Sequence, residues 1–222
     1  MNIEIIILLI TMLITLGAQA YINSWYIRTK KMPNDKKMTG KEVGRKILDA
    51  NGLKKVKVEE QPGTLTDHYD PRNKVVRLSS DIYNNTSLAS VSVASHECGH
   101  AIQDKDNYFF LRLRSSIVPL VNIASRLGYV AIMIGLIMGA LGFLRIGIIL
   151  EFVILAFQLI TLPVEFNASS RALKQIKELG IVVADEHRYC RKMLTSAALT
   201  YVASVATAIL EILRLLLIAR DR

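Results

Sequence analysis

Two histidines four residues apart, with a glutamate beside the first, are the residues of this chain best suited to chemistry. His96 and His100 stand at i and i+4, so on a helix their side chains differ in direction by only about 40°. One metal ion could bind both imidazoles. Glu97 lies about 100° round the helix from His96, where it could act as a general base on a water molecule beside the metal. The spacing predicts an HExxH zinc site.

The residues around this motif predict a helix that could hold it. The stretch 87–103 contains no proline and has recurrent small or apolar residues. Capping candidates precede it, namely Asn84, Asn85, Thr86 and Ser87. Gly99 would cost this helix up to about 1 kcal/mol relative to alanine, which is easier to understand where a strand, a substrate or another helix comes close. The alternative is an ordinary helix whose two histidines merely make hydrogen bonds.

A small α+β domain is expected to carry the motif helix. Thr39 to Glu42 form a capping-box pattern for a helix that reaches Ala50, with Gly52 as its stop. Three strand-like segments follow, at 55–60, 65–69 and 74–78. The turn signal at 70–73 makes the last two a hairpin. We expect this hairpin to lie beside the motif helix and to bind a substrate backbone by strand addition.

Polar side chains in the first strand of the hairpin could contribute to the site. Asp67, His68 and Tyr69 are the candidates, and His68 could act as a donor in the transition state. The alternative is that all three are solvated hairpin side chains.

Apolar residues are gathered in blocks, which is typical of a membrane protein. The chain has 222 residues, of which 51% are hydrophobic. Four segments are long enough to cross the roughly 30 Å hydrocarbon core, at 3–22, 117–141, 143–164 and 194–219. A short turn near Gly142 makes the middle two a hairpin. We read the first as a retained anchor, since it lacks a basic n-region and is longer than a usual signal-peptide core.

The predicted organisation has five parts. They are an anchor at 1–26, a cytoplasmic α+β domain at 27–116, a transmembrane hairpin at 117–164, a cytoplasmic helix or loop at 165–193 and a last transmembrane helix at 194–222. The fold class is therefore mainly α, with about four transmembrane helices and a small zincin-like α+β domain.

Charged residues within the spans need partners. Glu211 and Arg214 are spaced i,i+3 and could pair on one helix. Arg145 is expected at the hairpin turn, and Arg126 also needs a partner. Glu151 is expected to make a buried polar contact or to line a substrate path.

Lysine and arginine placement predicts the orientation. Basic residues are dense after the first span and after the hairpin, so both regions should be cytoplasmic. The formal net charge of +9 then reflects topology and contact with anionic lipid. The chain has no basic module interleaved with aromatic residues, so nucleic acid is not an expected partner.

A catalytic zinc needs a third protein ligand, and the hairpin returns the chain to the side that carries the motif. Glu165 is the leading candidate. Its alternative role is that of a carboxylate at a helix N-terminus just after Pro163. Weaker rivals for the ligand are Asp185, Glu186 and His187. Candidates for an oxyanion donor are Arg171, His187, His68 or a tyrosine.

The two cysteines are not expected to bind metal. Cys98 should point away from the His96 and His100 face, and Cys190 lies in a basic segment without paired spacing. Both are expected to be reduced thiols.

Taken with these features, the chain resembles the YugP-like neutral zinc metallopeptidase family of bacterial membranes. The resemblance runs through residues 63–72, 76–79, 95–103 and 162–169. It implies a zinc-dependent membrane peptidase with His96 and His100 as ligands and Glu97 as base. More distantly, the chain is similar to the HtpX and CAAX-prenyl-protease membrane peptidases. Their pattern has an aspartate where this chain has Ser169, and the YugP-like pattern often has an acid where Asn167 stands.

The expected function is hydrolysis of peptide bonds, with Zn²⁺ as cofactor, at or near the cytoplasmic membrane surface. Substrates would be peptides or membrane proteins, because the motif lies outside the apolar spans. One alternative is a site-2-protease-like intramembrane protease, which the charged flank 104–106 argues against. Another is a membrane scaffold that binds zinc without turnover.

Overall fold

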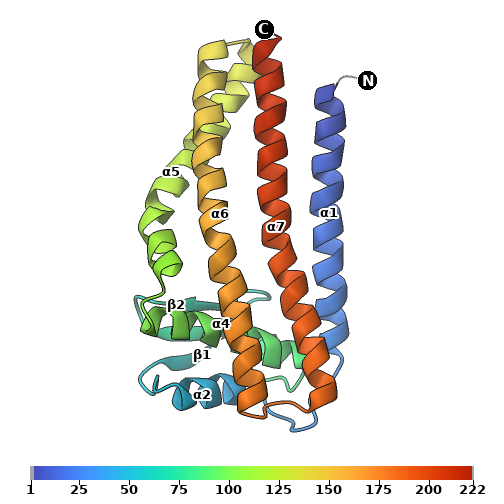
Figure 1. The fold of residues 1–222 in the computed structure, drawn as a ribbon, viewed down its shortest axis with the longest axis vertical. Helices are drawn as coiled ribbons and strands as arrows, with labels where there is room; N and C mark the ends of the chain where they lie inside the picture. The colour runs from blue at the N-terminus through green and yellow to red at the C-terminus, as the bar shows by residue number, and fades with distance from the viewer. Residues whose placement is uncertain (1–2, 222) are drawn as a thin grey trace. The chain divides into compact units, whose positions relative to one another are not determined.

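The computed structural model describes residues 3–221, which form seven helices and one three-stranded sheet. Figure 1 follows them in chain order: α1 (Ile3–Lys30), α2 (Gly40–Ala50), β1 (Lys57–Gln61), β2 (His68–Asp70), β3 (Val75–Ser79), α3 (Ser80–Tyr83), α4 (Leu88–Lys105), α5 (Phe109–Met138), α6 (Leu141–Glu178) and α7 (Ala184–Arg220). Four of the helices, α1, α5, α6 and α7, are long and apolar enough to cross a membrane. The protein is thus a mainly α membrane protein with a small sheet, as predicted.

Two compact units make up the chain. The first, which we call the membrane unit, contains α1 up to Ala20, the segment Arg112–Pro163 and α7 from Leu199 onward. The second, which we call the site unit, contains Tyr21–Leu111 and Val164–Ala198. Helices α1, α5, α6 and α7 each contribute residues to both units.

Within the membrane unit, α5 and α6 form the predicted hairpin. The helical break lies at Gly139 and Ala140, and Gly139 adopts a left-handed φ of 66°. The expected turn near Gly142 is therefore slightly displaced, since Gly142 already lies inside α6. Gly135 allows the two helices to approach closely, because a Cβ added there would lie 2.7 Å from the backbone nitrogen of Leu144.

A charged pair in α7 is satisfied locally. Arg214 Nε donates a hydrogen bond to Glu211 Oε2 at 2.8 Å, across the predicted i,i+3 spacing. The pair therefore brings a compensated charge, rather than an isolated one, into the apolar helix.

The sheet of the site unit has the order β1-β3-β2, with β1 parallel and β2 antiparallel to β3. Helices α2 and α4 pack on each other, and each contacts the sheet (Figure 1). Their apolar side chains meet in one core that includes Val43, Ile47, Leu78, Ile82 and Leu88. This core fixes α4 beside β2.

Local signals set the ends of the elements. The Thr39 capping box is present at the start of α2, and Gly52 follows its end with a φ of 73°. Strand β2 is shorter than the predicted 65–69. It begins only at His68, because Leu65 takes a left-handed φ of 57° and the Asp67 carboxylate accepts hydrogen bonds from Ser79 at 2.7 Å (N) and 3.1 Å (Oγ).

Candidate metal centre

Helix α4 presents the motif as expected. It starts at Leu88 with Ser87 as N-cap, whose side chain accepts a hydrogen bond from the Ser90 amide at 3.1 Å. The ring centroids of His96 and His100 lie 4.8 Å apart, so both imidazoles leave the same face of the helix.

Glu165 of α6 completes a compact group with these two histidines. One potential ligand atom from each of the three residues lies within 4.8 Å of the others, which makes them a possible metal-binding set among residues 3–221. Glu165 Oε2 is 3.2 Å from His96 Nε2 and 3.6 Å from His100 Nε2. The Glu165 residue is 2% exposed. Two imidazole nitrogens therefore converge on one buried carboxylate oxygen.

The alternative role for Glu165 does not match its place in the helix. Pro163 lies inside α6, which runs unbroken from Leu141 to Glu178, so no helix starts just before Glu165.

Gly99 of α4 allows α6 to approach α4 closely. A Cβ added to Gly99 would lie 2.5 Å from the carbonyl oxygen of Ala168, and only a residue without Cβ allows this approach. The sequence expectation of a close neighbour at Gly99 is confirmed.

The outer nitrogens of the two imidazoles also have partners. Ser169 Oγ lies 3.2 Å from His96 Nδ1, and Gln103 Oε1 lies 3.0 Å from His100 Nδ1. Ser169 thus occupies, next to His96, the position at which the related pattern has an aspartate. Such contacts orient imidazole ligands in metal sites.

Glu97 is buried on the same helix, with 8% of its surface exposed. Burial raises the pKa of its carboxyl to about 7, while His96 lowers the pKa and the negative charges of Glu165 and Asp67 raise it further. The backbone of Tyr69 has a smaller, opposite effect and lowers the Glu97 pKa. A carboxylate with a pKa near neutrality is suited to accept and return a proton.

His68 is engaged within the hairpin. Its Nδ1 lies 2.8 Å from the carbonyl oxygen of Thr66, which can only accept, so Nδ1 carries a proton. In the neutral ring Nε2 is then an acceptor, and it faces Arg77 Nη1 at 3.4 Å. This arrangement offers no spare donor for an oxyanion.

Arg171, a candidate oxyanion donor, is engaged in a different set of contacts. Its Nε donates to Asn167 Oδ1 at 2.7 Å, and its Nη1 pairs with Asp106. It lines a polar cavity of about 430 Å³ together with Asn51, Lys105, Lys174 and Gln175. Arg171 therefore belongs to a polar network behind His100.

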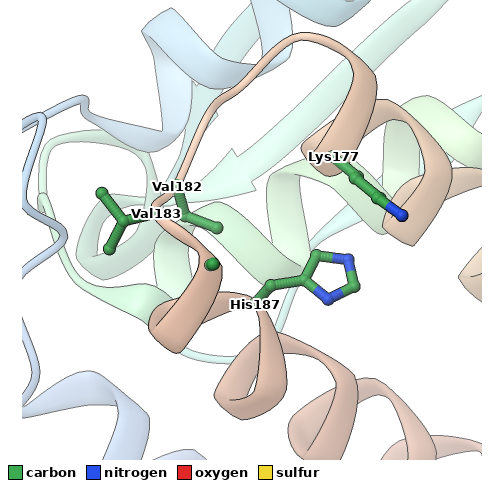
Figure 2. Close-up of a pocket in the computed structure, with 5 residues that line it drawn as sticks. Lys177, Val182, Val183 and His187 are labelled. Atoms are coloured by element: carbon green, nitrogen blue, oxygen red, sulfur yellow. The ribbon is translucent and has the colours of Figure 1, made fainter.

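The rivals for the third ligand lie elsewhere in the site unit. Figure 2 shows His187 beside a cavity of about 380 Å³ that Lys177, Val182, Val183 and Ala184 also line. His187 Nε2 lies 3.3 Å from the Leu173 carbonyl oxygen. Glu186 is buried and accepts hydrogen bonds from the backbone amides of Asp35 and Val183, and Asp185 is exposed.

Both cysteines are buried free thiols. Cys98 Sγ donates to the Gly44 carbonyl oxygen of α2 at 3.5 Å, away from the two histidines. Burial raises the pKa of the Cys98 thiol, which disfavours the thiolate that a metal would need.

Sequence reasoning missed Gln103. Its position three residues after His100 on the same helix was an available signal, because i and i+3 are neighbours on a helix surface. Its contacts to α6 depend on the tertiary fold.

Comparison with known proteins points to a zinc peptidase family. Residues 4–220 match the family described as "Putative neutral zinc metallopeptidase". The chain is also 46% identical over 201 residues to the "Putative membrane protease YugP" of Bacillus subtilis (strain 168), an alignment that covers 90% of this chain and 89% of that protein. No solved structure matches the chain. Because the family match spans nearly all of its length, the chain belongs to this neutral zinc metallopeptidase family.

Proposed function

We propose that the protein is a membrane-embedded zinc-dependent endopeptidase that hydrolyses peptide bonds at or near the cytoplasmic membrane surface. The observation that carries this proposal is the convergence of His96 Nε2 and His100 Nε2 on Glu165 Oε2, with Glu97 on the same helix.

The three residues fit a catalytic zinc ion. Two histidines and a glutamate are one of the ligand sets of catalytic zinc, which leaves a fourth position open. With metal–ligand bonds of about 2.0–2.2 Å, tetrahedral ligands lie roughly 3.3–3.6 Å apart. The distances of 3.2 and 3.6 Å from Glu165 Oε2 to the two imidazole nitrogens are close to this range.

Zinc bound by these residues would supply a Lewis acid that polarises the scissile carbonyl and makes water a stronger acid. The Glu97 carboxylate then accepts the proton of the attacking water and delivers it to the nitrogen of the leaving amine. Its burial supports this role, because a pKa near neutrality suits both uptake and release of the proton.

Strand β2 is the proposed docking edge for the substrate backbone. Among the described residues it pairs with β3 alone, so its other edge is not covered by a strand. Helix α4, which carries Glu97, contacts β2, and the Tyr69 backbone of β2 lowers the Glu97 pKa, which supports a general base beside this strand. An extended peptide added beside β2 would bring its scissile bond near Glu97.

The basic segments that follow α1 and the α5–α6 hairpin support a cytoplasmic site in the bacterial membrane. Helix α4 is not among the candidate spans in the described part of the chain, which favours cleavage at the membrane surface over cleavage within the bilayer.

The test combines zinc content with cleavage of casein and of a membrane protein. We expect about one zinc per chain in the wild type and in Glu97→Gln, because that change keeps the shape and leaves the ligands untouched. Cleavage by Glu97→Gln should fall by about 10²–10⁴-fold. His96→Ala should lose zinc, and Glu165→Ala should bind it more weakly.

Three results would count against the proposal. Stoichiometric zinc with equal cleavage by wild type and Glu97→Gln would remove the role of Glu97. Stoichiometric zinc without cleavage by the wild type would favour the scaffold alternative, and a wild type without zinc would exclude the metal centre.

A further inference from the structure

A continuous chain of hydrogen bonds runs behind His100. Asp106 pairs with Arg171, and Arg171 Nε donates to Asn167 Oδ1 at 2.7 Å. Gln103 Nε2 donates to the same Asn167 oxygen at 3.0 Å, and Gln103 Oε1 lies 3.0 Å from His100 Nδ1. All of these residues belong to the site unit.

The direction of this chain is determined by groups that have only one possible role. The Arg171 guanidinium can only donate, so the Asn167 atom that faces it must be the oxygen. The Val164 carbonyl can only accept, and Gln103 Nε2 donates to it at 2.8 Å. The Val164 carbonyl oxygen and Asn167 Oδ1 both accept, so both must face the amide nitrogen of Gln103. Its oxygen must then face His100.

This orientation decides where the imidazole of His100 carries its proton. The Gln103 oxygen can only accept, so His100 Nδ1 must be the protonated nitrogen. Nε2 is then the nitrogen on the metal side of the ring, where it faces Glu165 Oε2 at 3.6 Å. A metal ion requires an imidazole nitrogen with a free lone pair, which is what this tautomer provides.

His96 differs from His100 in this respect. Its Nδ1 faces the Ser169 hydroxyl, which rotates and can either donate or accept. Ser169 therefore does not select a tautomer. Gln103 is fully buried, and both of its amide atoms are used, so the amide cannot turn over without losing hydrogen bonds.

We infer that Gln103 is a positioning residue that holds His100 in the metal-binding tautomer before the metal arrives, with Asn167 and Arg171 fixing the direction of its amide. This inference rests on the proposed zinc site. Outer partners of this kind typically change metal affinity by about 10–100-fold.

The first test is the zinc Kd of the full-length protein in detergent, measured by competition with a chelator. Gln103→Met keeps the length of the side chain but removes the acceptor, and should raise the Kd by roughly 10–100-fold. Gln103→Glu retains the acceptor for His100 but lacks the Nε2 donor, so Val164 and Asn167 lose their hydrogen bonds, and its Kd should lie between those of wild type and Gln103→Met. Gln175→Met is the matched control, because Gln175 contacts Asn51 outside the network, and it should leave the Kd unchanged.

Asn167 provides a second pair of variants. Asn167→Asp keeps the oxygen that accepts from Gln103 and Arg171, so zinc affinity should be retained. Asn167→Leu removes it and should weaken binding, though less than Gln103→Met, because the Val164 carbonyl still orients the Gln103 amide.

A direct measurement does not depend on any variant. The chain has four histidines, so ¹⁵N labelling of histidine gives four imidazoles to assign in the NMR spectrum of the zinc-free wild type. We expect His100 to be protonated at Nδ1. A neutral His100 ring protonated at Nε2 instead of Nδ1, or Gln103→Met with wild-type zinc affinity, would overturn the inference. A wild type that binds no zinc but has the Nδ1 tautomer would instead refute the proposed function.

Discussion

The two imidazoles of the motif are held by outer partners of different chemistry. His100 meets an amide oxygen that can only accept, whereas His96 meets the hydroxyl of Ser169. The hydroxyl is a weaker acceptor than a carboxylate, because a charged acceptor makes hydrogen bonds about twice as strong. A stronger acceptor in place of Ser169 should therefore raise the zinc affinity of the site.

We predict that Ser169→Asp lowers the zinc Kd by about tenfold, because a carboxylate beside His96 Nδ1 makes this imidazole a more basic ligand. The zinc-free protein should unfold at a lower temperature, because Ser169 is only 8% exposed and the new charge is then buried. Chelator competition and thermal unfolding with and without zinc measure the two effects. Ser170→Asp, on the exposed side of α6, serves as the control, and equal Kd values for both variants would contradict the prediction.

At the level of elements, the approach of α4 to α6 depends on Gly99. Gly99→Ala should weaken zinc binding and lower stability by about 1–3 kcal/mol, because the new methyl group overlaps the Ala168 carbonyl. This loss outweighs the gain in helix propensity of up to about 1 kcal/mol. Zinc titration and denaturant unfolding would measure it. At Gly142, also helical, an added Cβ meets no atom within 4 Å, so Gly142→Ala should leave zinc affinity unchanged.

The turn between β2 and β3 should make stability sensitive to acid. Hydrogen bonds from the Asn73 side chain and backbone hold the pKa of Asp70 well below its usual range. A depressed pKa in the folded state means that ionised Asp70 stabilises the fold above its unfolded pKa of about 3.9. This stabilisation is lost as pH falls from there through the folded pKa.

We therefore predict that Asp70→Asn flattens the fall in thermal midpoint between about pH 4 and pH 2. Asn73→Ala should flatten it in part, since it removes the side-chain donor to Asp70 Oδ2 but keeps the backbone amide. The measurement is a series of thermal unfolding curves across this pH range. If the thermal midpoint of Asp70→Asn falls with pH as steeply as that of the wild type, other carboxylates dominate acid unfolding.

At the level of the whole molecule, the basic segments predict which side of the membrane each region occupies. Cysteine labelling in intact cells can test this, because Cys98 and Cys190 are buried and should give little background. Lys46→Cys, exposed on α2, should react with a membrane-impermeant maleimide only after permeabilisation. Met138→Cys, exposed beside the turn between α5 and α6, should react in intact cells. The reverse pattern would invert the proposed topology.

Much of the fold was predictable from the sequence, because the signals are local. The i,i+4 spacing of His96 and His100, the Thr39 capping box and the lengths of the apolar runs each depend on one segment of backbone. Strand β2 was less well predicted, because Asp67 is held by Ser79, a contact that forms only once the strands pair.

The candidate metal centre likewise combines local signals with contacts between distant segments. The sequence by itself determined that a helix would present two imidazoles on one face with Glu97 beside them, since helical geometry requires no distant contact. Only the tertiary structure decided that Glu165 lies 69 positions away from His96 yet 3.2 Å from its Nε2, and that Asn167 and Arg171 orient Gln103. These contacts arise from the packing of α4 against α6 at Gly99, and hydrogen bonds between distant segments form only where packing has already brought the segments together.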